Sequence, residues 1–153
     1  FRIFWDNAYG IHYLYDRPES EQPHILNILE ECEKAGNPDI VYEFCSTSKI
    51  TFSAGVAAMA SSEANIADIK SKLKWQTIGP DKINQLRHVR YFKDINGMKD
   101  YMKKHAAIIR PKFEAVLETL EKELGELGIA SWSKPVGGYF ISFNAEKGCA
   151  KAS

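Results

Sequence analysis

A strand, a helix and a second strand follow one another in the first 44 residues of this 153-residue chain, and this series constrains the fold most. Residues 1–5 are aromatic and β-branched, residues 23–35 carry apolar side chains at helical spacing, and residues 40–44 form a second apolar run. A helix placed between two strands in this way crosses over to a parallel neighbour. The sequence therefore predicts a βαβ unit and an α/β fold.

Beyond this unit, the pattern predicts one more strand and two helices, over residues 56–60, 64–74 and 81–92. In the last of these helices, three apolar residues recur on one face, and we expect that face to point inward: Ile83, Leu86 and Val89.

A long helical pattern over residues 98–127 leads out of this α/β part. Pro111 falls inside the pattern, so we expect a kink in the turn that precedes it. Two short strands follow, over residues 129–132 and 139–143, joined through a turn at glycines 137–138 that needs positive φ. These last elements predict the beginning of a small α+β part.

Composition excludes several classes of function. Twenty basic residues balance twenty acidic ones, so the zero formal charge argues against binding nucleic acid or an anionic membrane through general electrostatics. No apolar run reaches the roughly 18 residues that span a bilayer. The four histidines include no pair at metal-ligand spacing, so no metal site is predicted. Three widely spaced cysteines form no disulfide framework and fit a reducing, cytoplasmic setting: Cys32, Cys45 and Cys149.

Two charged side chains follow the predicted parallel strands. Asp6 ends the first strand, and Lys49 follows the second within the sequence STSK, beside the hydroxyl of Ser46. Ligands of α/β sheets bind outside the carboxyl ends of the strands, so Asp6 and Lys49 are expected at one edge, which Tyr9 can also face. A lysine in a loop is most often simply solvated, and an aspartate after a strand is often a turn residue. From spacing alone, both interpretations stay open.

A basic cluster lies in the helix predicted over 81–92 and just after it. Such a cluster can receive a phosphate or an acidic partner, but more often it is the solvated face of a helix. Its members are Arg87, His88, Arg90 and Lys93.

Three motifs in register resemble the pyridoxal-phosphate-dependent aminotransferases of fold type I: DNAY at 6–9, STSK at 46–49 and KPVGGYF at 134–140. The phrases TSKITFSAGVA and QTIGPDKINQLRHVRYF are similar to the type Ic aspartate aminotransferase subgroup. The similarity spans essentially the whole chain. It implies part of the fold-type-I large domain, a mostly parallel sheet with flanking helices, plus the start of the small α+β domain.

The resemblance also implies how the chain is organised. Residues 1–95 look like the C-terminal part of the large cofactor-binding domain, 96–128 like the long interdomain helix, and 129–153 like the start of the small C-terminal domain. The family's glycine-rich phosphate loop precedes this segment, and its arginine for the substrate α-carboxylate follows it. We therefore expect an internal fragment of a longer protein, inactive by itself.

Roles for five residues follow from the resemblance. Lys49 looks like the lysine that holds the cofactor as an aldimine and then moves the substrate proton, which requires a partly neutral amine. Asp6 looks like the partner of the pyridine nitrogen, and Tyr9 like the phenol that hydrogen-bonds the ring's 3-oxygen. Ser46 looks like a hydroxyl donor to the cofactor phosphate. Thr77 lies in a region that often reaches the cofactor of a neighbouring subunit.

The chain departs from the family pattern at one position. Most relatives carry an arginine eight residues after the lysine, where it binds the cofactor phosphate, and here that position is Ala57. The phosphate must therefore be neutralised by other groups.

The function implied is transfer of an amino group between aspartate and 2-oxoglutarate by a ping-pong mechanism. The expected cofactor is pyridoxal 5'-phosphate, the partners are a small amino acid and a 2-oxo acid, and the family's sites are usually built across a homodimer. Two alternatives stay open: a non-catalytic truncated or pseudo-enzyme interaction module, and another transaminase or a lyase on the same fold.

Overall fold

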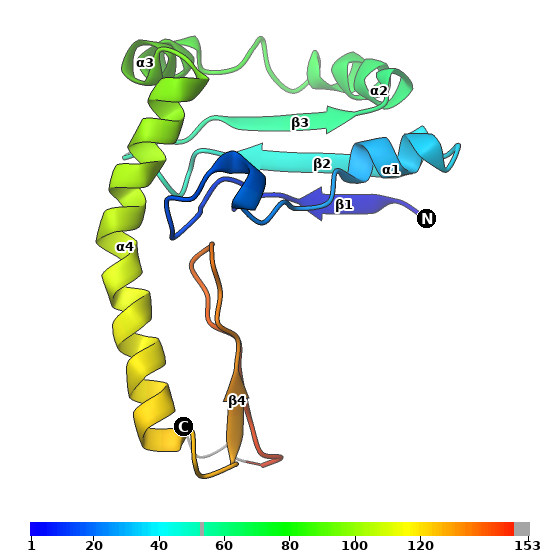
Figure 1. Ribbon diagram of the computed structural model, residues 1–153. Coiled ribbons are helices and arrows are strands. Elements are labelled where there is room, and N and C mark those ends of the chain that lie inside the picture. The colour runs from blue at the N-terminus through cyan, green and yellow to red at the C-terminus, as the bar shows by residue number, and fades with distance from the viewer. Residues whose placement is uncertain (53, 149–153) are drawn as a thin grey trace. The chain divides into compact units, whose positions relative to one another are not determined.

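A computed structural model describes residues 1–52 and 54–148. The chain divides into two compact units (Figure 1). The first unit comprises residues 1–10 and 24–98, and the second comprises residues 11–23 and the chain from Lys99 onward.

The first unit is built on a sheet of three strands that lie side by side in the order β1, β2, β3 (Figure 1). β1 (Ile3–Asp6) pairs in parallel with β2 (Val41–Ser46), as the βαβ pattern predicted. β3 (Ala57–Ser61) pairs with β2 in the antiparallel sense. A parallel crossover needs about a dozen or more residues, and only residues 47–56 separate β2 from β3. This short connection accounts for the return of β3 along β2.

Polar side chains set where the three helices of the first unit begin. The helices are α1 (Ile28–Lys34), α2 (Glu63–Leu73) and α3 (Lys82–Phe92). Their N-cap side chains each accept a backbone amide from the first turn, and these caps are Asn27, Ser62 and Asp81. The helix predicted over 23–35 is therefore wrong at its start, because the Asn27 cap places the first helical residue at position 28. A short 3-10 turn, η2 (Pro38–Ile40), leads into β2.

α3 faces the opposite way from the sequence prediction. Ile83 is 84% exposed and Val89 is 63% exposed, whereas Asn84 is only 8% exposed. Phe92, two turns after Asn84, is also buried, and His88 between them is half-buried. The stripe that packs thus combines two polar residues, Asn84 and His88, with the apolar Phe92 at i, i+4 and i+8. Apolar periodicity failed here because polar partners in a loop decide which face is buried.

The core of the first unit forms where α1 covers β2. Val41, the first residue of β2, has no exposed surface, and Cys32 on α1 is 6% exposed. The thiol of Cys32 is free, as is that of Cys45, while Cys149 lies outside the described residues.

The second unit contains most of α4 (Ile95–Leu124), together with a short 3-10 turn, η1 (Glu19–Glu21). α4 continues as helix through Pro111, although a proline lacks the amide that would bond the preceding turn. Its buried residues are Met102, Ala106 and Phe113, which recur at helical spacing along one face. Neither α4 nor any other helix in the described ranges has the length and hydropathy to cross a membrane.

A two-stranded antiparallel sheet follows α4. It pairs β4 (Ala130–Trp132) with β5 (Phe143–Ala145), so the strand predicted over 139–143 is wrong except at its last residue. The chain before β5 contacts another segment instead. Gly137 forms a β-bridge with Tyr13, and the amide of Gly138 donates to the carbonyl of His12 at 2.8 Å. Gly138 has φ +78°, the positive φ predicted for this turn.

Three aromatic side chains meet in the second unit. The phenol of Tyr139 lies 3.0 Å from Nε2 of His105, and the ring of His12 lies edge-on to both rings. Burial lowers the pKa of His105 below its ordinary value of 6.5, because the charged imidazolium loses hydration.

We predict that replacing Val41 by Ala lowers the free energy of unfolding by about 2 kcal/mol, since two buried methyl groups are lost and a cavity is left. Val89→Ala on exposed α3 surface is the matched control, with an expected change within about 0.5 kcal/mol. Urea denaturation of the full-length protein measures both. Equal losses would contradict the burial described for Val41.

We also predict that His105→Gln reduces the sensitivity of the fold to acid. Because the folded pKa of His105 lies below its unfolded value, the folded state binds fewer protons. The resulting stability is present above pH 6.5 and is lost as the pH falls through the folded pKa. Gln keeps a hydrogen-bonding group without titrating. Urea midpoints between about pH 7 and pH 5 measure the effect, with exposed His24→Gln as control. The prediction would be refuted if the urea midpoint of His105→Gln fell between these pH values as much as the midpoint of the parent protein.

Candidate active site

The carboxyl ends of β1 and β2 lie together at one edge of the sheet. Asp6 is the last residue of β1 and stands opposite Phe44, two residues before Ser46 ends β2. The ladder continues for one more bond, from the amide of Asn7 to the carbonyl of Phe44 at 2.8 Å. The structure thus brings Asp6, Ser46 and the segment that carries Lys49 to the edge at which ligands of α/β sheets bind.

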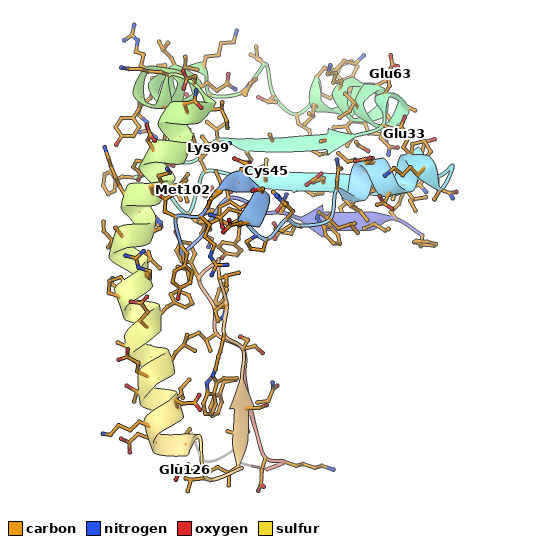
Figure 2. The ribbon with its side chains drawn as sticks, viewed as in Figure 1. Glu33, Cys45, Glu63, Lys99, Met102 and Glu126 are labelled. Carbon is orange, nitrogen blue, oxygen red and sulfur yellow. The ribbon has the colours of Figure 1, made fainter. Side chains whose placement is uncertain are left out.

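Asp6 and Ser46 also lie on the same face of the sheet. Successive side chains of a strand alternate between faces, so Ser46 lies on the same face as Phe44, two residues before it. Asp6 is the register partner of Phe44 on β1, so its side chain lies on that face too. Phe4 stacks on Phe44 with ring centroids 5.9 Å apart, which confirms the common face. Cys45 belongs to the opposite face and is labelled on β2 in Figure 2.

Lys49 lies in a tight turn that begins at Thr47. The carbonyl of Thr47 accepts the amides of Ile50 and Thr51, each at 3.0 Å, and the hydroxyl of Thr51 at 2.9 Å. Ile50 is buried at 6% exposure, while Lys49 beside it is exposed. The buried neighbour and the three bonds therefore hold the backbone of the exposed lysine at the sheet edge.

The two arms of the loop that follows β2 are bonded across its base. We name residues 47–52 and 54–56 the lysine loop. Thr47 donates its amide to the carbonyl of Val56 at 2.9 Å, and the amide of Val56 donates to Oγ1 of Thr47 at 2.8 Å. Gly55 approaches so closely that a Cβ there would lie 2.6 Å from the backbone nitrogen of Ser48. Only a residue without a side chain fits this contact.

α3 supplies three further bonds to the lysine loop. Nδ2 of Asn84 donates to the carbonyl of Gly55 at 2.8 Å, and Arg87 donates to the carbonyl of Ala54 at 2.8 Å. Nε2 of His88 lies 2.7 Å from Oγ1 of Thr47. The sequence pattern placed His88 in a basic cluster, and such a cluster is most often a solvated helix face. That interpretation is wrong for His88, which is half-buried and contacts the lysine loop. Sequence reasoning missed this set, although polar residues at i, i+3 and i+4 of a helix are a visible signal.

The turn after β1 carries Tyr9 and is bonded to the neighbouring strand. Nδ2 of Asn7 donates to the Glu43 carboxylate at 2.9 Å, and Tyr9 is half-buried. Gly10 leaves the space that the side chain of Asn7 occupies, since a Cβ there would lie 2.6 Å from Oδ1 of Asn7. This packing links the turn of Asp6 and Tyr9 to β2.

Two other positions singled out in the sequence, 57 and 77, lie outside the bonded network of the lysine loop. Ala57 is the register partner of Ser46, so an arginine at position 57 would stand directly across from that hydroxyl, and this chain has only a methyl group there. Thr77 is exposed between α2 and α3, where its hydroxyl donates to the carbonyl of Gly79 at 2.9 Å. Its bonds to Gly79 and Leu73 are local and do not join it to the sheet edge.

No group of three or more possible metal ligands occurs among the side chains that the structure describes.

The family model and the curated relatives that match this chain point to the same family. The family model described as aspartate amino-transferase matches residues 1–153. A curated protein of Corynebacterium glutamicum named aspartate aminotransferase is 46% identical over 158 aligned residues, covering 98% of this chain and 34% of its own length. The chain therefore spans about a third of the length of the curated relatives it matches.

Solved structures agree with this result. The crystal structure of an aspartate transaminase from Corynebacterium glutamicum has a TM-score of 0.90 at 45% identity, covering 98% of this chain and 35% of that chain. An α-aminoadipate aminotransferase from Thermus thermophilus has a TM-score of 0.71 at 19% identity, covering 96% of this chain and 35% of that one, a likeness of fold alone. Both confirm the predicted α/β fold class.

We predict that Gly55→Ala destabilises the lysine loop by about 1–3 kcal/mol, because the added methyl group meets the backbone of Ser48. Gly79→Ala is the matched control, since nothing lies within 4 Å of a Cβ at Gly79. Hydrogen–deuterium exchange of peptides spanning 47–56 and urea midpoints measure the change. Similar results for both variants would disprove the close approach at Gly55.

Proposed function

This chain belongs to the aspartate aminotransferase family, and from that premise we propose that it is an internal part of a pyridoxal-phosphate-dependent aminotransferase. We assign residues 1–95 to the large domain of that enzyme, 96–128 to its interdomain helix and 129–153 to the start of its small domain. The proposed reaction exchanges an amino group between aspartate and 2-oxoglutarate.

One observation carries the proposal. The turn of Lys49 emerges at the carboxyl edge formed by two parallel strands, where Asp6 and Ser46 end those strands on a common face. An amine, a carboxylate and a hydroxyl are thereby gathered at one edge from segments 43 residues apart in sequence. A solvated loop lysine needs no such arrangement.

The donor set fits the proposed cofactor. Among the described residues, the one hydrogen bond of the Ser46 side chain is accepted from the amide of Ser48 at 3.4 Å, so its hydroxyl proton is available to a phosphate oxygen. The exposed carboxylate of Asp6 suits a protonated ring nitrogen, and the phenol of Tyr9 suits the ring's 3-oxygen. The primary amine of Lys49 suits covalent attachment to an aldehyde.

When bound, pyridoxal phosphate supplies an electron sink for the bonds at the substrate α-carbon. The residues of this chain would hold and orient it. The negative charge of Asp6 would favour the protonated ring nitrogen, and the hydroxyl of Ser46 would donate to the phosphate end. The amine of Lys49 would take the proton from the substrate α-carbon as a general base. With Ala57 opposite Ser46, the charge of the phosphate must be met by donors outside position 57.

The substrate pair and the assembly are parts of the same proposal. The Corynebacterium glutamicum relative is named aspartate aminotransferase, which supports aspartate as the amino donor and 2-oxoglutarate as the acceptor. A cytoplasmic homodimer, with Thr77 directed toward the partner's cofactor, is the arrangement we propose for the whole enzyme. Exposure of the Thr77 hydroxyl is compatible with that role.

We predict that the full-length protein binds pyridoxal phosphate with a visible absorbance band and that borohydride traps the adduct at Lys49. Lys49→Ala should abolish the band and lower transamination of aspartate by at least about 100-fold, because the amine is both the attachment point and the base. Absorbance titration, peptide mapping after reduction and a coupled assay with 2-oxoglutarate measure these effects.

Lys82→Ala, an exposed lysine on α3, is the matched control and should keep both the band and the activity. Labelling spread over many lysines, or none, would overturn the enzyme proposal and favour a non-catalytic interaction module. An absorbance band with the adduct at Lys49 but no turnover of aspartate would contradict the proposed substrate and favour another transaminase or a lyase on this fold.

A further inference from the structure

We propose that Thr47 and His88 form a positioning pair that holds the turn of Lys49 for reaction with the cofactor. This inference rests on the proposed function and adds a residue of α3 to the site. Neither residue need touch the substrate or the cofactor, because the pair acts through the backbone of the lysine loop. The contact that carries the proposal is the 2.7 Å separation between Oγ1 of Thr47 and Nε2 of His88.

The hydrogen-bond partners determine which atom carries each proton. Nδ1 of His88 lies 2.8 Å from the carbonyl of Asn84, and a carbonyl can only accept, so Nδ1 carries the proton. In the neutral imidazole, Nε2 is then an acceptor. Oγ1 of Thr47 already accepts the amide of Val56 at 2.8 Å, which leaves its own proton to donate. The proton points to Nε2 of His88 at 2.7 Å, in preference to the carbonyl of Val56 at 3.5 Å.

Thr47 transmits this restraint to Lys49 through its main chain. Its carbonyl accepts three donors from Ile50 and Thr51, and these bonds close the turn in which Lys49 lies. Its amide bonds the carbonyl of Val56 on the other arm. A change in the position of Thr47 therefore moves the turn of Lys49 relative to Ser46, the end of β2. The side chain of His88 sets that position from outside the loop.

Packing alone does not explain why α3 presents His88 to the loop. The helix leaves Ile83 84% exposed and Val89 63% exposed while it buries Asn84 at 8% exposure. A helix that served only as cover would turn its apolar face inward. Phe92 at the end of the same stripe is buried, and Asn84 and His88 before it bond polar groups of the lysine loop, so these bonds together with Phe92 set the orientation of α3.

The test uses the full-length protein loaded with pyridoxal phosphate, in two matched pairs of variants. His88→Leu and Thr47→Val remove the hydrogen bond, whereas His88→Gln and Thr47→Ser keep a group able to make it. Arg90→Gln, an exposed change on the same helix, is the control. The readouts are the dissociation constant of the cofactor by absorbance, the rate of borohydride trapping at Lys49, and hydrogen–deuterium exchange of residues 47–56 without cofactor.

We expect His88→Leu to slow trapping at Lys49 and to weaken cofactor binding about fivefold, the factor expected for one net hydrogen bond. Thr47→Val also removes the oxygen that accepts the amide of Val56, so its effect should be at least as large. Exchange over 47–56 should rise by a similar factor, and the Gln and Ser variants should stay within about twofold of the parent. Arg90→Gln should change none of the readouts. If His88→Leu does not fold, the comparison of Thr47→Val with Thr47→Ser decides.

Three results would overturn the proposal. Trapping at Lys49 at the parental rate in both His88→Leu and Thr47→Val would show that the pair does not position the lysine, while the proposed function would stand. A parent protein that forms no adduct at Lys49 would refute both the proposed function and the role given to this pair. Faster exchange without slower trapping would assign the bond to loop stability alone and would also refute positioning.

Discussion

The parallel pairing of β1 with β2 is the constraint on which the candidate site depends. Its register sets Asp6 opposite Phe44, and the alternation of side chains then puts Asp6 and Ser46 on one face at the carboxyl edge. A slip of one residue would send Ser46 to the other face. Val41, wholly buried where β2 begins, and α1 above it hold the register from the opposite end of the strand.

The lysine loop depends on a different kind of interaction. It contains few large apolar side chains that can pack, so polar bonds define its shape: Thr47 joins its two arms, and Asn84, Arg87 and His88 bond it from α3. Buried polar groups left without partners are costly, so each of these bonds constrains where its partner lies. An exposed lysine can thereby sit on a well-defined backbone, which is what covalent chemistry at its amine requires.

The accuracy of prediction from sequence varied with the physical origin of each element. The βαβ series succeeded because β1 and β2 are apolar runs whose helical connection admits one parallel pairing. The inward face of α3 was predicted wrongly because apolar spacing carries no information about bonds to a distant loop. The strand expected over 139–143 forms only at its end, since Gly137 and Gly138 bond a segment more than a hundred residues earlier.

By itself, the sequence determined the α/β class, the parallel pair of strands and the family, because apolar periodicity and motifs are local signals that survive without a fold. It also marked Asp6, Ser46 and Lys49 as candidates. Only the tertiary structure decided the antiparallel return of β3, the face that α3 turns to the lysine loop, and the bond between Thr47 and His88. These features join residues between 11 and 41 positions apart in the chain, and such pairings depend on satisfying backbone and side-chain polar groups in three dimensions, which no local pattern records.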